Sequence, residues 1–310
     1  MKLKLRNHDI KAISVALPRS FKSLDDELEF CNLSAKKYEI LKAQTGINTH
    51  FTTNENTFAS DLATNALNEL LKSEILAKNE LDMLIISSFT PDFYAPGLSS
   101  LVAKNLNLNK NTLCFDEIGF CAGFLQGLFK AFLALENESI KKVVLLCVNV
   151  KSKKISPKDK ISYLSITDSA SAVLIEKSNS KQNAFYSQQT FSEHALQETL
   201  PCNAFNENFD DFIRVDGDLI FSFVMQNFPE FFNDFLNEFK LDKNKELFLQ
   251  ASSNFFKAKL LEKLESPYKE DEVLKNFGDA NINKIPLELA LKATGGGAFK
   301  TACKLVLAQA

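Results

Sequence analysis

One segment of this 310-residue chain places a cysteine at the predicted start of a helix, a position that activates thiols. In residues 115–128, FDEIGFCAGFLQGL, an extended stretch ends in small residues, Cys121 follows, and an amphipathic helical pattern starts at once. At a helix N-terminus, unpaired N–H groups and the macrodipole favour the nucleophilic thiolate, and a nearby N–H can hold an oxyanion. The residues therefore predict a nucleophilic Cys121. The alternative interpretation is a buried cysteine that serves as a small hydrophobic side chain.

The other cysteines give no sign of a metal centre or of disulfide bridges. Cys31, Cys114, Cys147, Cys202 and Cys303 form no C-x-x-C pair and no Cys/His cluster with metal-ligand spacing. We therefore expect free thiols and predict no metal and no cofactor.

The elements that would position Cys121 alternate between strands and helices. Before and around Cys121, periodicity predicts strands at 9–17, 81–87, 112–117 and 142–150, with helices at 56–72, 98–106 and 121–135. Beyond a basic stretch at 151–160, which we interpret as a solvated loop, it predicts strands at 171–176, 247–251 and 302–307 and helices at 217–239, 253–264 and 285–293. The pattern indicates an α/β protein. LDMLIISS at 81–88 weakly resembles KELFLQASS at 245–253, so an internal duplication is compatible with the sequence.

Composition excludes several classes of protein. The 36 Lys and Arg residues against 39 Asp and Glu leave a net charge of −3. The chain therefore lacks the excess of positive charge that binding to nucleic acid requires. No apolar run reaches the length of about 18 residues that a membrane span needs, and charged residues interrupt the first 20 positions. We therefore expect a soluble cytoplasmic protein that binds neither nucleic acid nor membrane.

Six collinear motifs resemble the 3-oxoacyl-[acyl-carrier-protein] synthase III group of thiolase-fold condensing enzymes. They are FDEIGFCAGF around Cys121, TGI at 45–47, SSFTPDFYAPGLSSLVAKNLNL at 87–108, ITDSASAVLIE at 166–176, FGDANINKIPLEL at 277–289 and TGGGAFKTACKLVL at 294–307. The resemblance implies a layered α/β/α/β/α fold with internal duplication. It divides the chain into an N-terminal half, 1–172, which carries Cys121, and a C-terminal half, 173–310, and it implies a homodimer.

The resemblance also implies a set of site residues, and this chain departs from it at two of them. The family pairs its cysteine with a histidine and an asparagine that hold the thioester carbonyl. Here the histidine position falls on Leu249, or on Gln250 if the register slides by one, and the asparagine position is Asp279. An anion facing a developing negative charge should oppose decarboxylation, so we expect malonyl-carrier protein to be decarboxylated slowly. Gln250 or Asn281 would then orient the carbonyl.

A general base could come from Asp279, whose pKa a partly buried cleft would raise, or from a histidine. A helix-capping or turn role is the alternative for Asp279. Of the three histidines, His8 and His50 are expected at the surface, and His194 in the polar segment SEHALQE is a further candidate.

Three positions concern the substrate. The resemblance implies that the N–H groups of Cys121 and Gly296 form the oxyanion hole, although a plain turn is the alternative for the glycine run. The resemblance implies that at the position of Ala95 family members limited to short acyl chains carry a phenylalanine, which a dimer partner inserts into the pocket, so alanine here predicts a longer acyl group. Ile40 and Gln44 stand where the family commonly has the Trp and Arg that bind the adenine of coenzyme A, so we expect weaker binding of coenzyme A here.

These residues suggest three functions. The first is a synthase III-like condensation through an acyl-Cys121 intermediate, with an acyl-carrier protein or acyl-CoA thioester as substrate. The second is an O- or N-acyltransferase that does not decarboxylate, with Asp279 as the base for a hydroxyl or amine acceptor. The third is a non-catalytic family member that partners an active paralogue or carrier protein; the missing histidine favours it, and the retained Cys121 opposes it.

Overall fold

A computed structural model describes residues 1–31, 33–156, 158–191, 199–200, 212–243, 246–294 and 307–309. Up to the middle of the chain the elements are β1 (Lys2–Arg6), β2 (Asp9–Leu17), β3 (Phe21–Ser23), α1 (Leu24–Cys31), α2 (Ala35–Thr45), β4 (Thr49–Phe51), α3 (Ala59–Lys72), the 3-10 helix η1 (Lys78–Glu80), β5 (Met83–Ser88), α4 (Leu98–Leu106), β6 (Leu113–Ile118), α5 (Gly123–Leu135), β7 (Lys142–Asn149), the 3-10 helix η2 (Lys151–Lys154), α6 (Lys160–Ser165) and β8 (Ser169–Glu176).

The second half continues with shorter strands and longer helices. They are β9 (Asn183–Ser187), β10 (Thr199–Leu200), β11 (Arg214–Val215), α7 (Gly217–Phe239), α8 (Asn254–Lys263), α9 (Glu272–Phe277), the 3-10 helix η4 (Asn281–Asn283), α10 (Lys284–Thr294) and β12 (Leu307–Gln309). Within the described ranges, no helix is long and apolar enough to span a membrane.

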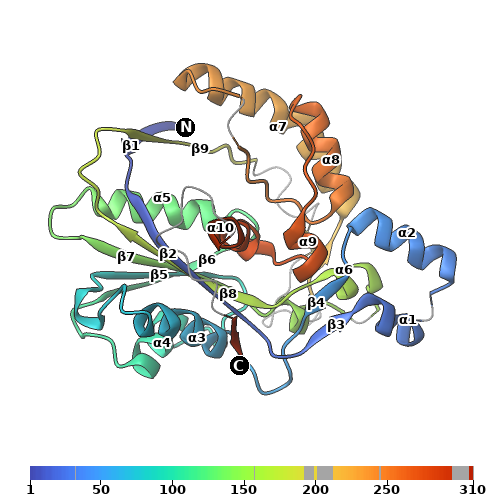
Figure 1. Cartoon of the computed structure of the whole chain (residues 1–310), viewed down its shortest axis with the longest axis horizontal. Helices are drawn as coiled ribbons and strands as arrows, with labels where there is room; N and C mark the ends of the chain where they lie inside the picture. Colours follow the sequence, from blue (N-terminus) through green and yellow to red (C-terminus); the bar gives the residue numbers. More distant parts are fainter. Residues whose placement is uncertain are drawn as a thin grey trace.

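A mixed six-stranded sheet forms the centre of the molecule, in the order β12-β2-β8-β7-β5-β6 (Figure 1). β6 and β7 both pair with β5 in parallel, whereas β8 runs antiparallel to β7 and β2. The parallel strands β5, β6 and β7 therefore end at one edge of the sheet, which is where α/β proteins usually place their sites.

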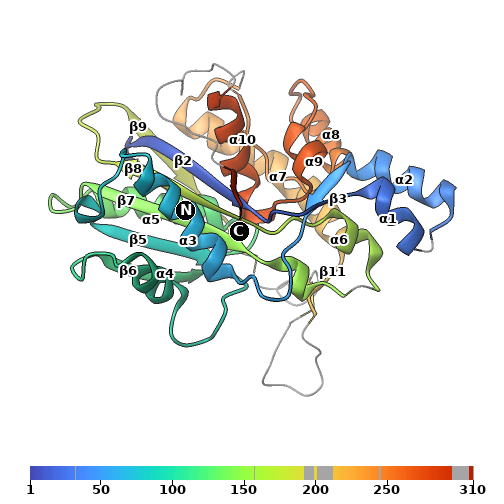
Figure 2. The ribbon, with the colours of Figure 1, turned by 60° about the horizontal axis from the view of Figure 1, so that its bottom comes forward.

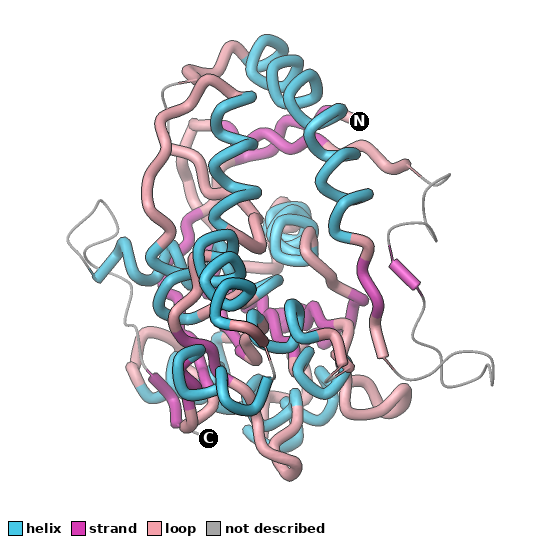
Figure 3. The backbone as a smooth tube through the Cα atoms, turned by 90° about the vertical axis from the view of Figure 1, so that its right-hand side faces the viewer, coloured by secondary structure: helices cyan, strands magenta, loops and turns pink. Residues whose placement is uncertain are grey.

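Helices cover both faces of the sheet. Figure 2 shows α3 and α4 on one face and α10 on the other, and α5 lies on the same side as α10 (Figure 1). α7 and α8 stand beyond α5 and α10, away from α3 and α4 (Figure 1), and contact each other; Figure 3 shows the backbone from the side.

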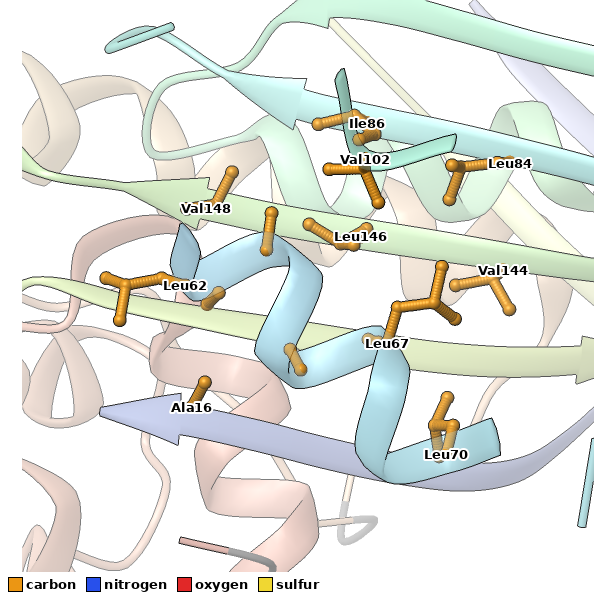
Figure 4. Close-up of a cluster of buried hydrophobic side chains, with 14 of the residues drawn as sticks. Ala16, Leu62, Leu67, Leu70, Leu84, Ile86, Val102, Val144, Leu146 and Val148 are labelled. Carbon is orange, nitrogen blue, oxygen red and sulfur yellow. The ribbon is translucent and has the colours of Figure 1, made fainter. Parts of the chain in front are cut away.

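Strand side chains alternate between two hydrophobic cores, as the period of two in a strand requires. Beneath α3 and α4, Leu84, Ile86, Val144, Leu146 and Val148 pack against α3 residues such as Leu62 and Leu67 (Figure 4). The neighbouring positions in the same strands face α5 and α10; they include Met83, Ile85, Val143, Leu145 and Cys147. This burial on both faces explains why the strand sequences are continuously apolar.

The α/β class is confirmed, and most predicted elements are present. β2, α4 and α7 have the predicted bounds, and the bounds of α3, α5, β5, β6, β7 and β8 differ from prediction by three residues or fewer. The predicted strand at 247–251 forms no strand, and only residue 307 of the predicted strand at 302–307 is described. The division at 172/173, which falls within β8, stays a prediction.

Candidate active site

The turn that carries Cys121 lies between β6 and α5 and is held tightly against the sheet. The N–H of Gly119 donates to the carbonyl of Ser88 at 3.2 Å, and α5 begins two residues after Cys121. A Cβ on Gly119 would lie 1.8 Å from Ser87 Oγ, and one on Gly123 would lie 2.5 Å from Ile282 Cδ1. Only glycine permits this close approach, which brings the turn against β5 and η4.

The sulfur of Cys121 accepts a hydrogen bond from Asn281, at 3.3 Å from Nδ2. Asn281 is buried, and its backbone has φ +47°, a left-handed conformation that asparagine tolerates better than most residues. Its Oδ1 in turn accepts from Nδ2 of Asn149 at the end of β7, at 3.3 Å. The amide of Asn281 is thereby oriented with its donor toward Cys121.

Asp279 is fixed beside this pair by its backbone. Its N–H donates to the carbonyl of Ser165 at 2.7 Å, its carbonyl accepts from the N–H of Thr167 at 3.0 Å, and its Oδ1 accepts from the N–H of Asn281 at 3.0 Å. The preceding Gly278 has φ +76°, and a Cβ there would lie 2.8 Å from Thr167 Oγ1. The glycine therefore permits the chain to pass close to Thr167 and place Asp279 at the site.

Lys151 completes the arrangement and corrects a prediction. The interpretation of 151–160 as a solvated loop is wrong at its start, because Lys151 is only 8% exposed. Its Nζ lies 3.8 Å from Oδ2 of Asp279 and 5.8 Å from the centre of the Phe120 ring. A buried ammonium requires a partner, and Asp279 supplies one.

These neighbours set the protonation of Cys121. The residue is reachable from solvent, as a nucleophile must be, but its sulfur is crowded by the surrounding groups. Burial raises the pKa of the Cys121 thiol above its ordinary value of 9.0; Asp279 raises it further, while the charge of Lys151 and the hydrogen bond from Asn281 lower it. The start of a helix alone therefore does not make Cys121 a thiolate here.

The two positions considered for the missing histidine behave differently. Leu249 is buried in a hydrophobic cluster with Leu260 and Leu261. Gln250 is half-buried, and its Oε1 has no hydrogen-bond partner among the described residues. Among the described residues, the side-chain donor to the Cys121 sulfur is Asn281 and not Gln250.

Two of the three histidines are buried, so the prediction of a surface position for them is wrong. His50 lies 2.6 Å from Oε2 of Glu27 through Nε2 and 3.0 Å from the Ile166 carbonyl through Nδ1. His8 accepts from the N–H of Ser178 at 3.2 Å. These polar partners make burial of the rings tolerable. His194 and Gly296 lie outside the described residues.

Ala95 lies in the loop between β5 and α4 and is exposed in the single chain. Phe93 and Tyr94 beside it are also exposed. Its predicted role in setting acyl length depends on a partner subunit and stays a prediction.

Sequence reasoning missed Lys151 and Asn149. Asn149 is an amide at the end of the otherwise apolar strand β7, and Lys151 follows two residues later. Polar residues at the carboxyl end of a buried parallel strand were the available signal. In the part of the chain that the structure describes, no group of three or more His, Cys, Asp or Glu residues could hold a metal ion.

Comparison with known proteins identifies relatives of this chain. The sequence profile of 3-oxoacyl-[acyl-carrier-protein] synthase III matches residues 115–193, which include Cys121. A Campylobacter jejuni protein provisionally named 3-oxoacyl-[acyl-carrier-protein] synthase 3 is 32% identical over 262 residues, which is 78% of this chain and 73% of the relative. A Clostridium botulinum beta-ketoacyl-[acyl-carrier-protein] synthase III is 26% identical over 81% of this chain and 80% of its own length.

Solved structures show the same fold. The 3-oxoacyl-(acyl-carrier protein) synthase of Burkholderia xenovorans superposes with a TM-score of 0.86 at 21% sequence identity, covering 94% of this chain and 87% of that one. The thiolase-like fold is thus confirmed. On the strength of its sequence likeness across most of the chain, this protein belongs to the 3-oxoacyl-[acyl-carrier-protein] synthase III family of condensing enzymes.

Proposed function

We propose that the protein transfers acyl groups from a carrier thioester through an acyl-Cys121 intermediate. The observation that supports this most is the hydrogen bond from Asn281 Nδ2 to the Cys121 sulfur, 3.3 Å long, at the start of α5. It places an amide donor next to the sulfur that would form the acyl thioester.

In the first half-reaction, the Cys121 thiolate attacks the carbonyl carbon of the donor thioester. The carbon–sulfur bond to the carrier breaks, and the carrier thiolate takes up the proton that Cys121 gave to solvent. The amide of Asn281 would donate to the carbonyl oxygen as negative charge develops there. The donor is an acyl-carrier protein or an acyl-CoA thioester, in keeping with the family name.

In the second half-reaction, the favoured acceptor is the carbanion of a malonyl thioester. Loss of carbon dioxide leaves an enolate, whose carbon attacks the acyl-Cys121 carbonyl and releases the cysteine. The product is a 3-oxoacyl thioester. The ammonium of Lys151, 3.8 Å from Asp279, offsets the negative charge that this aspartate would otherwise set against the enolate.

A second candidate is transfer to a hydroxyl or amine acceptor, for which Asp279 would be the base. The specific observation in its favour is that Asp279 lies beside Asn281 and Lys151 in place of the family's neutral asparagine. A carboxylate can take the proton from such an acceptor, and no decarboxylation is then needed. A non-catalytic role is the third candidate; the retained Cys121 opposes it, and the missing histidine favours it.

The test is mass spectrometry of the intact protein mixed with a panel of carrier-protein and coenzyme A thioesters. We expect one acyl adduct that maps to the Cys121 peptide, and none on the Cys121→Ala variant. Cys114→Ala and Cys147→Ala are matched controls, since their thiols lie within strands β6 and β7. An adduct that survives in Cys121→Ala would refute the assignment.

Once a donor is known, the acceptor is decided by product. Release of labelled carbon dioxide together with a 3-oxoacyl thioester would establish condensation. An ester or amide formed without carbon dioxide would establish acyl transfer, in agreement with the expectation that decarboxylation is slow.

A second copy of the chain is the proposed partner in assembly. β6 pairs only with β5 among the described strands, and its residues Leu113, Phe115 and Ile118 are exposed, Ile118 to 89%. An uncovered edge strand with apolar side chains is prone to pair with another chain. Light scattering should show a dimer, and Ile118→Lys should shift it toward monomer; a monomeric wild-type protein would contradict this.

A further inference from the structure

Lys151 is an unusual residue for the place it occupies. Lysine is rarely buried unless it is paired, yet this side chain is 10% exposed and its ion-pair distance to Asp279 Oδ2 is 3.8 Å. By contrast, the buried Lys284 approaches Asp271 to 2.7 Å. The looser pairing leaves the Lys151 ammonium with hydrogen-bonding capacity that Asp279 does not use fully.

The contacts of Lys151 place its charge among the neighbours of Cys121. Lys151 lies at the carboxyl end of β7, and its ammonium lies over the ring of Phe120, the residue directly before Cys121. Asp279, its partner, contacts Asn281, whose amide donates to the Cys121 sulfur. Lys151, Asp279 and Asn281 thus approach Cys121 from η2, from the segment after α9 and from η4, respectively.

We propose that Lys151 is a positioning residue that stabilises the Cys121 thiolate and so supports attack on the thioester. The inference rests on the proposed function of Cys121 as nucleophile. Asp279 holds the ammonium in place. Cys121, Lys151 and Asp279 would then correspond to a nucleophile, an adjacent group that activates it and a third group that orients the second.

The chemistry needs no further reactant. Cys121 loses its proton to solvent, and the charge of the ammonium stabilises the resulting thiolate. When the sulfur forms its bond to the acyl carbon, the negative charge passes to the carrier sulfur, which takes a proton from solvent. Lys151 neither gains nor loses a proton in the cycle.

The charges facing Cys121 act in opposite directions, which gives the proposal a measurable sign. Lys151 lowers the pKa of Cys121 and Asp279 raises it, while Asn281 stabilises the thiolate by its hydrogen bond. Removing the ammonium should therefore move the thiol pKa further up and leave less thiolate at neutral pH. One pKa unit is a tenfold change in thiolate fraction well below the pKa.

The experiment measures iodoacetamide alkylation of the full chain from pH 6.5 to 10.5, with each cysteine followed by peptide mass spectrometry. We expect Lys151→Met and Lys151→Gln to alkylate Cys121 about tenfold more slowly at pH 7.5, with the midpoint moved to higher pH. The matched control is Lys153→Met, on the same 3-10 helix, because Lys153 donates to the carbonyls of Glu55 and Thr57 instead. Its Cys121 profile should equal that of the wild type.

An internal control and a second variant separate the proposed effect from unfolding. The Cys114 peptide is an internal control for general unfolding, since its alkylation should not change in a folded variant, and the Gln variant serves if the Met variant does not fold. Unchanged Cys121 midpoints in a folded Lys151 variant would overturn the proposal. A shifted midpoint in a protein that no thioester acylates would refute the proposed function and leave the Lys151 assignment standing.

Discussion

Removal of the Asn281 amide is the sharpest test of the site. Because Asn281 has φ +47°, most substitutions would add about 1–2 kcal/mol of backbone strain and confuse the result. Asn281→Gly avoids this, since glycine adopts the same φ freely. It deletes the donor to Cys121 and the acceptor for Asn149, and it leaves the turn in place.

The expected magnitude follows from the two lost hydrogen bonds. Loss of one oxyanion donor costs about 10²–10³ in kcat, or about 2.7–4 kcal/mol of transition-state stabilisation. Loss of the acceptor leaves Nδ2 of Asn149 unpaired in the core, which costs about 1–3 kcal/mol of folding stability. The catalytic loss should therefore appear in a protein that is still folded at 25 °C.

The assay is single-turnover acylation of Cys121 followed by intact mass, together with urea unfolding. Asn107→Gly is a matched control, because Asn107 has φ +49° and is the C-cap of α4, where its N–H donates to the carbonyls of Ala103 and Lys104. It should keep the wild-type rate. If Asn281→Gly acylates within threefold of the wild type while Asn107→Gly behaves as expected, the assignment of Asn281 as a donor is refuted.

Three further predictions concern the scaffold and the substrate. Gly119→Ala should destabilise the fold by about 1–3 kcal/mol in urea unfolding, because its Cβ would lie 1.8 Å from Ser87 Oγ, and Ser87→Ala should recover part of the loss. Ala95→Phe should shift the preference for acyl-chain length toward short thioesters, because each methylene excluded from the pocket loses about 0.8 kcal/mol of burial. An unchanged preference would show that other residues limit the length of the acyl pocket. Burial raises the pKa of Asp271, but Lys284 and other partners outweigh burial and hold the pKa below 3.8. The ionised Asp271 therefore stabilises the folded state above pH 3.8, and this stabilisation is lost as the pH falls through the pKa of Asp271 in the folded protein. Lys284→Met should cost about 3 kcal/mol at pH 7 and flatten that acid dependence; equal acid sensitivity in both proteins would contradict it.

The sequence by itself determined the alternation of elements and identified Cys121 as the candidate nucleophile. Strands buried on both faces have continuous apolar runs, and α5 carries its apolar stripe at helical spacing, so local pattern reports them directly. Cys121 could be recognised because small residues, a cysteine and a helix start are neighbours in the chain. The family could be inferred because the order of its motifs is also read directly along the chain.

The tertiary structure alone decided which residues surround the sulfur. Asn281 is 160 residues from Cys121, and Lys151 and Asp279 meet across 128 positions, so no local pattern links them. The sequence placed Lys151 in solvent because lysines in a basic stretch usually lie there, and the pairing with Asp279 reversed that preference. It likewise placed His8 and His50 at the surface, although polar partners from distant segments allow both to be buried. Periodicity reports which face of an element is apolar; the partners of a buried polar group depend on packing between elements, and only the folded chain specifies them.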